Sequence, residues 1–179
     1  MTRLLGIVFL AALAAGCSST GGGQSASKEG ESKSSMISDL QSARLSASTV
    51  SARKLMYSKV EGTLTKGNTA AKYKAYYSDD VLRIVEEVSK HGDSGESDKG
   101  YFLDSESRLF YYVASDERVK GSGKDKVKIR IAYDETGKVV GSEKSVNGEP
   151  VKVSEAELKS VKVRLDSLRK AAGASRKAK

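Results

Sequence analysis

Few side chains in this sequence are suited to catalysis. His91 is the only histidine, and a serine activated by it would form a hydrolase nucleophile. Serines occur throughout the chain, so no spacing singles out a Ser–His pair. The neighbouring carboxylates Asp79-Asp80 and Glu86-Glu87 resemble acid–base pairs, but adjacent residues of a strand point to opposite faces. We therefore expect solvated charges there and no enzyme activity, with a hydrolase that uses a serine and His91 as the alternative.

A second candidate is a cation site in the segment HGDSGESD. Asp93, Glu96 and Asp98 could offer oxygen ligands to Ca²⁺, although their spacing is not that of an EF-hand loop. Asp, Gly and Ser are also the residues that hairpin tips favour for backbone reasons alone. We expect a turn here, with no metal and no cofactor.

A third candidate is a basic, tyrosine-bearing surface formed by two alternating segments. One segment contributes Lys72, Lys74 and Tyr76, and the other contributes Lys126, Lys128 and Arg130. Such a face would suit an anionic glycan or an acidic partner protein. The alternative is a solubilising face of a one-sided sheet, neutralised by cross-strand pairing with Glu87, Asp116 and Glu117.

Composition and charge limit the remaining possibilities. The 179 residues are 38% hydrophobic and 30% charged, enough for one domain with a core, and the single cysteine excludes an internal disulfide. The net charge of +8 arises mainly from residues 159–179, which hold eight basic side chains and one aspartate. Because residues 17–158 are electrically balanced, nucleic acid is not an expected partner.

The elements that would position these residues begin with a helix. Apolar residues at three- and four-residue steps predict a helix from Met36 to about Leu55. Strand-like runs follow at residues 57–64, 70–77, 81–88, 100–104, 108–115, 126–133 and 138–146. The short links between them indicate antiparallel hairpins. In the run 81–88, Leu82, Ile84 and Val88 are expected on one face.

Three of the hairpins look alike in sequence. YYSDDVLRIV, YFLDSESRLFYYV and AYDETGKVV each have an aromatic strand end, an Asp at the turn and then an aliphatic strand. We interpret them as a repeated supersecondary unit.

The last element is a C-terminal helix. Ser154 and Glu157 form a capping-box pair, and Gly173 is the expected C-terminal stop. Its apolar stripe has heptad spacing but spans only about two heptads, so packing on the sheet is favoured over a coiled coil. The stripe consists of Leu158, Val161, Leu165, Leu168 and Ala172. The fold class is therefore α+β: an antiparallel β-meander of about six or seven strands, flanked by an N-terminal and a C-terminal helix.

The start of the chain combines a positive residue, an apolar run and a cysteine. Arg3 precedes twelve residues from Leu4 to Ala15, whose helical length of about 18 Å is too short to cross a bilayer. Ala14-Ala15-Gly16-Cys17 follows, and this order resembles the lipobox of bacterial lipoprotein precursors, with Ala14 where that family prefers Leu. The later hairpins are loosely similar to small outer-membrane lipoproteins with a β-meander domain.

The lipoprotein resemblance implies a location in the cell and a set of domain boundaries. Signal peptidase II would cleave between Gly16 and Cys17, and Cys17 would be acylated and held in the membrane. Ser18 after the cysteine implies transfer to the outer membrane, with the domain facing the periplasm. We expect a signal peptide at 1–16, a lipidated cysteine and flexible tether at 17–35, a globular domain at 36–173 and a basic tail at 174–179.

The basic C-terminal residues suggest contact with an anionic surface such as lipid headgroups, lipopolysaccharide or peptidoglycan. The residues concerned are Arg169, Lys170, Arg176, Lys177 and Lys179. Lys179 also resembles the last residue of the murein lipoproteins of enteric bacteria, which is linked to peptidoglycan through its side-chain amine. That resemblance implies the same link as a hypothesis for Lys179.

Together these features predict a non-enzymatic, lipid-anchored envelope protein. Its β-domain would bind another envelope component, either a protein or a glycan such as peptidoglycan. One alternative is a periplasmic inhibitor or immunity protein against a cell-wall hydrolase. The other is an envelope hydrolase that uses a serine with His91.

Overall fold

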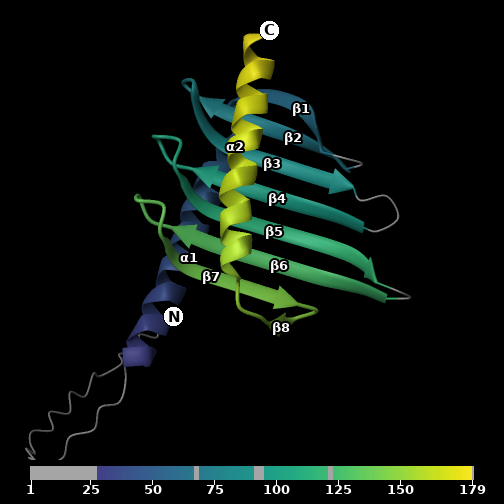
Figure 1. Ribbon diagram of the computed structural model, residues 1–179. Helices are drawn as coiled ribbons and strands as arrows, with labels where there is room; N and C mark the ends of the chain where they lie inside the picture. The colour runs from purple at the N-terminus through teal and green to yellow at the C-terminus, as the bar shows by residue number, and fades with distance from the viewer. Residues whose placement is uncertain (1–27, 67–68, 91–94, 121–122, 179) are drawn as a thin grey trace, which may run out of the picture.

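The fold is one antiparallel sheet between two helices (Figure 1). The computed structural model describes residues 28–66, 69–90, 95–120 and 123–178. The helices are α1 (Lys28–Ala52), the 3₁₀ helix η1 (Lys54–Met56) and α2 (Glu155–Lys177). The strands are β1 (Ser58–Lys66), β2 (Thr69–Ser78), β3 (Val81–Lys90), β4 (Gly95–Leu103), β5 (Leu109–Lys120), β6 (Gly123–Tyr133), β7 (Val139–Val146) and β8 (Glu149–Pro150).

Sheet order follows chain order from β1 to β8, so the predicted antiparallel meander with a helix before and after it is confirmed. The number of strands is eight within the described residues, whereas the sequence analysis expected six or seven. The additional strand is the two-residue β8, which pairs with the end of β7. It forms because Asn147 and Gly148 both take positive φ, 55° and 93°, which gives a tight hairpin turn.

The two helices cover opposite faces of the sheet. In Figure 1 α2 crosses in front of all the long strands, and α1 lies behind them. In α1 the least exposed of its residues from Ser38 onward are Leu40, Ala43, Ala47 and Val50, the stripe expected from the sequence. The face that carries α1 is called the α1 face below, and the opposite one the α2 face.

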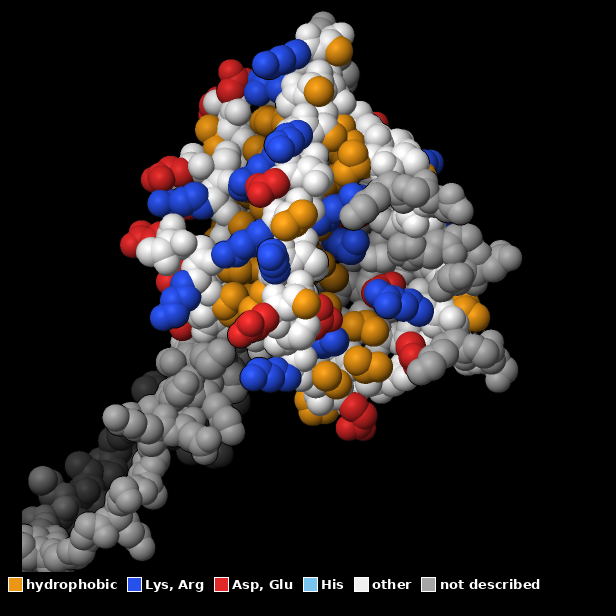
Figure 2. Space-filling model, viewed as in Figure 1, with side chains coloured by type: hydrophobic (Ala, Val, Ile, Leu, Met, Phe, Trp, Pro, Cys, Tyr) orange, Lys and Arg blue, Asp and Glu red, His pale blue; other side chains and the backbone are white. Residues whose placement is uncertain are grey.

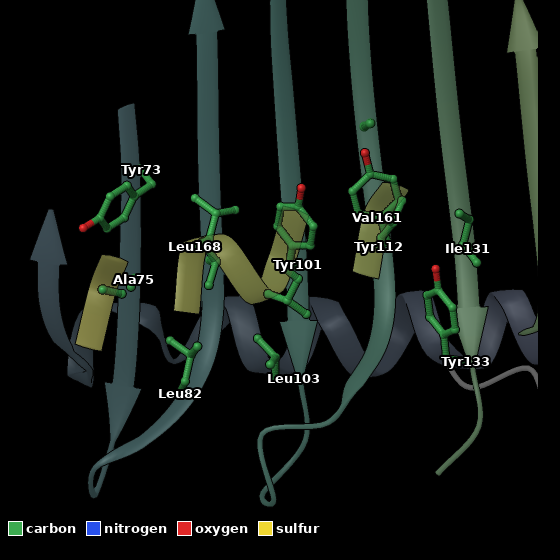
Figure 3. Packing of buried hydrophobic residues seen from close by; sticks show 14 of the residues in the cluster. Tyr73, Ala75, Leu82, Tyr101, Leu103, Tyr112, Ile131, Tyr133, Val161 and Leu168 are labelled. Carbon is green, nitrogen blue, oxygen red and sulfur yellow. The ribbon is translucent and has the colours of Figure 1, made fainter. Parts of the chain in front are cut away.

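The main core lies between α2 and the sheet (Figure 3). Val161, Leu165, Leu168 and Ala172 of the helix are buried against a sheet face rich in tyrosine. The sheet contributes Tyr73, Tyr101, Leu103, Tyr112, Ile131 and Tyr133, among others. The predicted heptad stripe therefore packs on the sheet.

Helix α2 begins as expected and ends later than expected. Glu157 N–H donates to the Ser154 hydroxyl, and the Glu157 carboxylate accepts from Ser154 N–H at 2.9 Å, which completes the capping box. The helix continues through Gly173 to Lys177. Its last turn is held by the sheet, because Ser175 is hydrogen-bonded to the Tyr73 hydroxyl at 3.0 Å and Arg176 binds Asp80. Most of the predicted tail is thus helical.

The start of α1 also differs from the expected boundary. The helix begins at Lys28, inside the segment 17–35 that the sequence analysis assigned to the tether. Lys and Glu in this segment are good helix formers, so the absence of large apolar residues did not prevent a helix.

The three similar hairpins share a structural irregularity. Each of β3, β5 and β7 has one extra residue at the same place after its turn, namely Arg83, Phe110 and Val140. Such bulges increase the local twist and reverse which face the following residues occupy. Leu82 therefore lies on the α2 face while Ile84 lies on the α1 face, so the prediction that both share a face is wrong.

Basic residues of α2 anchor the helix to the turns of these hairpins. Lys162 donates to the Gly137 carbonyl at 2.8 Å, Arg169 donates to the Ser107 carbonyl, and Arg176 binds Asp80. These side chains recur every seven residues, about 10.5 Å along a helix. Successive hairpins recur every two strands, about 9.6 Å across a sheet. The match places one cation over each turn.

The capping box gives a first testable prediction. Ser154→Ala is expected to lower the free energy of unfolding by about 1 kcal/mol, because Glu157 N–H loses its cap and the Glu157 carboxylate loses the hydrogen bond from the Ser154 hydroxyl. Urea denaturation of the purified protein measures this change. Ser167→Ala, which removes an exposed hydroxyl that donates to the Val163 carbonyl of the same helix, is the control and should stay within about 0.5 kcal/mol. Equal effects of the two variants would show that the cap contributes nothing specific.

Candidate binding cavity

On the α2 face, the sheet is apolar near the turns that Lys162, Arg169 and Arg176 contact. It becomes more polar toward the other ends of the strands. Strand pairing aligns one row of side chains there: Ser89, Ser97, Asp116, Val127 and Val146. The next row, closer to the turns, is Glu87, Lys99, Ala114, Ile129 and Lys144. In both rows the polar groups come mainly from β3 to β5 and the aliphatic ones from β5 to β7. The two rows thus form an amphipathic surface beside α2.

Glu87 is a buried carboxylate at the centre of a polar cluster on this surface. Its exposure is 1%, and Arg164 of α2 holds both of its oxygens, with a shortest distance of 2.8 Å from Nη2 to Oε1. Ser89 and Tyr101 donate to the carboxylate at 3.0 and 3.3 Å, and Lys99 lies 3.5 Å from Oε1. Burial opposes ionisation, but the hydrogen bonds and charges of Arg164 and Lys99 outweigh it and hold the pKa of Glu87 below its ordinary value.

A partly enclosed cavity of about 300 Å³ lies between the first turns of α2 and strands β4 to β7. Its polar lining consists of Ser97, Lys99, Tyr112, Asp116 and Arg118 from β4 and β5, Lys144 from β7, and Glu157 and Ser160 from α2. Its apolar wall consists of Ala114, Val127, Ile129, Ile131, Val146 and Val161. This volume is at the lower end of the range for small-molecule sites, about 300–1,000 Å³.

Two buried oxygen atoms at this cavity have no hydrogen-bond partner among the described residues. They are the Ser97 hydroxyl, whose residue is 2% exposed, and Oδ1 of Asp116. Ser97 and Asp116 are directly paired across β4 and β5. The Tyr112 hydroxyl likewise makes no hydrogen bond within the described part of the chain, and burial together with nearby carboxylates raises its pKa. Buried polar groups without partners are uncommon, and they mark the cavity as a place where a ligand could bind.

The charged residues that line the cavity are already paired. Arg118 binds Oδ2 of Asp116 at 2.6 Å, and Lys144 binds Glu157 at 2.7 Å. Burial tends to raise the pKa of Glu157, but the bonds from Lys144 and Ser154 lower it overall. The cavity is therefore bordered by ion pairs. Its Ser97 hydroxyl and Oδ1 of Asp116 have no hydrogen-bond partner among the described residues.

The predicted basic, tyrosine-bearing surface lies on the other side of the sheet. Strand register places all six of its residues on the α1 face, but β3, β4 and β5 separate the two sets. Lys72 and Lys74 line an open groove with Glu61 and Glu86. Tyr76 is buried, donates to Glu86 at 3.0 Å and lies beneath the Lys54 ammonium.

The second set is largely neutralised by acidic neighbours. Arg130 pairs with Glu143 at 2.9 Å, and Lys126 lies 4.0 Å from Glu117, while Lys128 is exposed. Glu87 and Asp116, which the sequence analysis considered as neutralising partners, lie on the α2 face instead. The six residues thus form two separate surfaces.

The predicted anionic contact at the C-terminal end also divides into two groups. Arg169 and Arg176 are bound to hairpin turns, whereas Lys170 and Lys177 are exposed. Figure 2 shows Lys and Arg side chains along α2 on the visible face. A hollow of about 550 Å³ lies beside Lys162 and Arg169, but both cations already donate to turn carbonyls at its edge.

Several predicted residues lie outside the described residues, namely Gly16, Cys17, His91, Asp93 and Lys179. Glu96 and Asp98 are described, and both point to the α1 face of β4, away from the cavity. Within the described part, no cluster of His, Cys, Asp and Glu could hold a metal ion. None of the helices described is both long and apolar enough to cross a membrane.

The central residues of the cavity were not identified as a site from the sequence. Ser97 was placed in a hairpin tip, and Glu87 was expected to be solvated. A useful signal was the alternation of Val85, Glu87 and Ser89, which continues one face of β3 beneath α2.

In comparisons with known proteins, no family model, curated protein or solved structure matches the chain.

Proposed function

We propose that this chain is a non-enzymatic binding protein of the bacterial envelope, anchored to the outer membrane through a lipid on Cys17. Its domain faces the periplasm and binds a protein or glycan component of the envelope. The observation that supports binding is the cavity between α2 and the sheet, where the Ser97 hydroxyl and Oδ1 of Asp116 are buried and have no hydrogen-bond partner among the residues that the structure describes.

The carboxyl groups with a shifted pKa do not have the raised pKa of a catalytic general acid. A general acid in catalysis needs a pKa raised toward neutrality. Each carboxyl group with a resolved shift has its pKa lowered, because donated hydrogen bonds and nearby cations outweigh any effect of burial. These groups are Glu87, Asp104, Glu117, Asp134 and Glu157. Among the described residues these carboxylates therefore fit a structural or binding role better than acid catalysis.

The anchor is tested by changing the cysteine of the lipobox-like motif. Cys17→Ser should prevent acylation, because serine has no thiol to receive the lipid. Labelling cells with a radioactive fatty acid is expected to mark the wild-type protein and not the variant. The wild-type protein should fractionate with outer membranes and the variant should not. An unlabelled wild-type protein with a free thiol in its intact mass would contradict the proposal.

The binding role is tested with a photo-crosslinking residue placed at Ser160 of the full-length protein in cells. Ser160 lies at the cavity, and Val163 on the same helix is 59% exposed and does not line the cavity. We expect a discrete adduct with a protein or a glycan from position 160 and none from position 163. Absence of an adduct, or the same adduct from both positions, would show that the cavity does not contact an envelope component.

A further inference from the structure

We infer that the cavity beside α2 binds one uncharged sugar ring. This inference rests on the proposed function and specifies the chemistry of the ligand. It follows from three features of the cavity: its unpaired oxygens, its balanced charges and its amphipathic walls.

The unpaired oxygens require a ligand that can donate hydrogen bonds. Oδ1 of Asp116 only accepts, since an ionised carboxylate has no hydrogen to give. The hydroxyls of Ser97 and Tyr112 can both donate and accept. A ligand hydroxyl has the same two capacities, so neighbouring hydroxyl groups could satisfy all three side chains. A ligand with acceptors alone would leave Asp116 unsatisfied.

The charges around the cavity favour a neutral ligand. Each of its three cations has a carboxylate partner: Lys99 with Glu87, Arg118 with Asp116, and Lys144 with Glu157. An anionic ligand would compete with these carboxylates, and a cationic ligand would face the three nearby cations. Either charge would also be transferred from water into a partly enclosed space, which is unfavourable without a free partner.

The polar and aliphatic parts of the cavity lining match the hydroxyl edge and the C–H face of a sugar ring. Ser97, Tyr112 and Asp116 form the hydroxyl-binding side on β4 and β5. Strands β6 and β7 continue the same sheet face with aliphatic side chains that suit the C–H face of the ring, namely Val127, Ile129 and Val146. The volume of about 300 Å³ limits the occupant to about one ring, so a longer glycan would have to place a single residue there.

The test uses simple sugars and the full-length protein in detergent. N-acetylglucosamine and glucose are the neutral probes, and glucosamine and glucuronate are charged analogues of similar size. Titration followed by NMR should shift the resonances of Ser97 and Tyr112 with at least one neutral probe. We expect at least tenfold weaker binding of both charged analogues.

Two variants and a control locate the binding. Asp116→Asn should weaken binding of the neutral sugar about tenfold or more, since a neutral amide replaces the charged acceptor and can present its NH2 group to the ligand hydroxyl. Ser97→Ala should weaken it several-fold without lowering the melting temperature, because this hydroxyl has no hydrogen-bond partner within the described part of the chain. Asp98→Asn is the matched control on the opposite face of β4 and should leave binding unchanged.

The outcomes separate this inference from the proposed function. If no neutral sugar binds, or if a charged analogue binds better, the inference is overturned. A protein adduct from position 160 together with no sugar binding would retain the binding role and exclude the sugar. Loss of both the adduct and sugar binding would overturn both.

Discussion

Arg164→Met is expected to lower the free energy of unfolding by about 3 kcal/mol. Methionine retains much of the apolar volume but leaves the Glu87 carboxylate, 1% exposed, without its main partner. Removing one member of a buried ion pair typically costs about 3–5 kcal/mol. Lys99 and Tyr101 still contact the carboxylate, which places the expected effect at the lower end of that range.

The effect of Arg164→Met should depend on pH in a definite direction. In the wild-type protein the pKa of Glu87 is lowered on folding from an ordinary value of 4.5, so ionised Glu87 stabilises the fold above that pH. This contribution is lost as the pH falls through the lower, folded pKa. In the variant, burial is less opposed, so the pKa rises and protonation relieves the unpaired charge. The stability difference between the two proteins should therefore shrink from pH 7 toward pH 4.

Denaturant unfolding at both pH values measures these changes. Arg130→Met serves as the control, because Arg130 pairs with the exposed Glu143 and an exposed pair contributes less than about 1 kcal/mol. A loss for Arg164→Met no larger than that for Arg130→Met would show that the Glu87 cluster is not a buried ion pair. A stability difference that stays constant with pH would lead to the same conclusion.

The sequence was informative where its pattern had one physical interpretation. In the segment 126–133 the side chains alternate regularly, and β6 follows that alternation, with Ile129 and Ile131 toward α2 and Lys128 on the other face. Ser154 and Glu157 similarly predicted the start of α2, because a capping box depends on contacts within four residues. Local interactions of this kind are visible in a sequence.

Face assignments failed at the bulges because one additional residue reverses the alternation. Nothing in the local sequence of β3 marks Arg83 as the extra residue, yet its position separates Leu82 from Ile84. The same displacement brings Glu87 beneath α2 and under Arg164, 77 residues further along the chain. The buried cluster therefore depends on long-range pairing that periodicity alone does not specify.

Ser97 was missed for a related reason. Gly, Ser and Asp are favoured in turns, so the segment around Ser97 was interpreted as a hairpin tip. β4 nevertheless begins at Gly95 because it is paired on both sides, with β3 and with β5. Gly95 has a φ of 127°, and an added Cβ would lie 1.8 Å from the Glu117 carbonyl, so only glycine fits this close approach.

The heptad spacing of α2 had two structural explanations. A seven-residue repeat is typical of a coiled coil, but it also matches the spacing of successive hairpins in a meander. The structure shows the second arrangement, with Lys162 and Arg169 over adjacent turns and Leu165 buried between them in sequence. The seven-residue repeat of α2 thus follows from the spacing of the hairpins on which the helix packs.

Leu168→Ala is expected to lower the free energy of unfolding by about 2–5 kcal/mol. Leu168 is fully buried in the middle of α2, against the tyrosine-rich face of the sheet (Figure 3). Truncation removes its apolar contacts and leaves a cavity that the sheet cannot readily fill. Val163→Ala on the outward side of the same helix is the control and should change stability by less than about 0.5 kcal/mol.

The Leu168→Ala variant also tests whether α2 supports the proposed cavity. Glu157, Ser160 and Val161 reach the cavity from this helix, so weaker docking of α2 should loosen its wall. We expect faster amide hydrogen exchange along α2 and weaker binding of any cavity ligand in the variant, with neither change in Val163→Ala. Unchanged exchange and stability in Leu168→Ala would mean that α2 does not depend on this contact. The wall of the cavity would then be held in place by contacts other than the packing of Leu168 on the sheet.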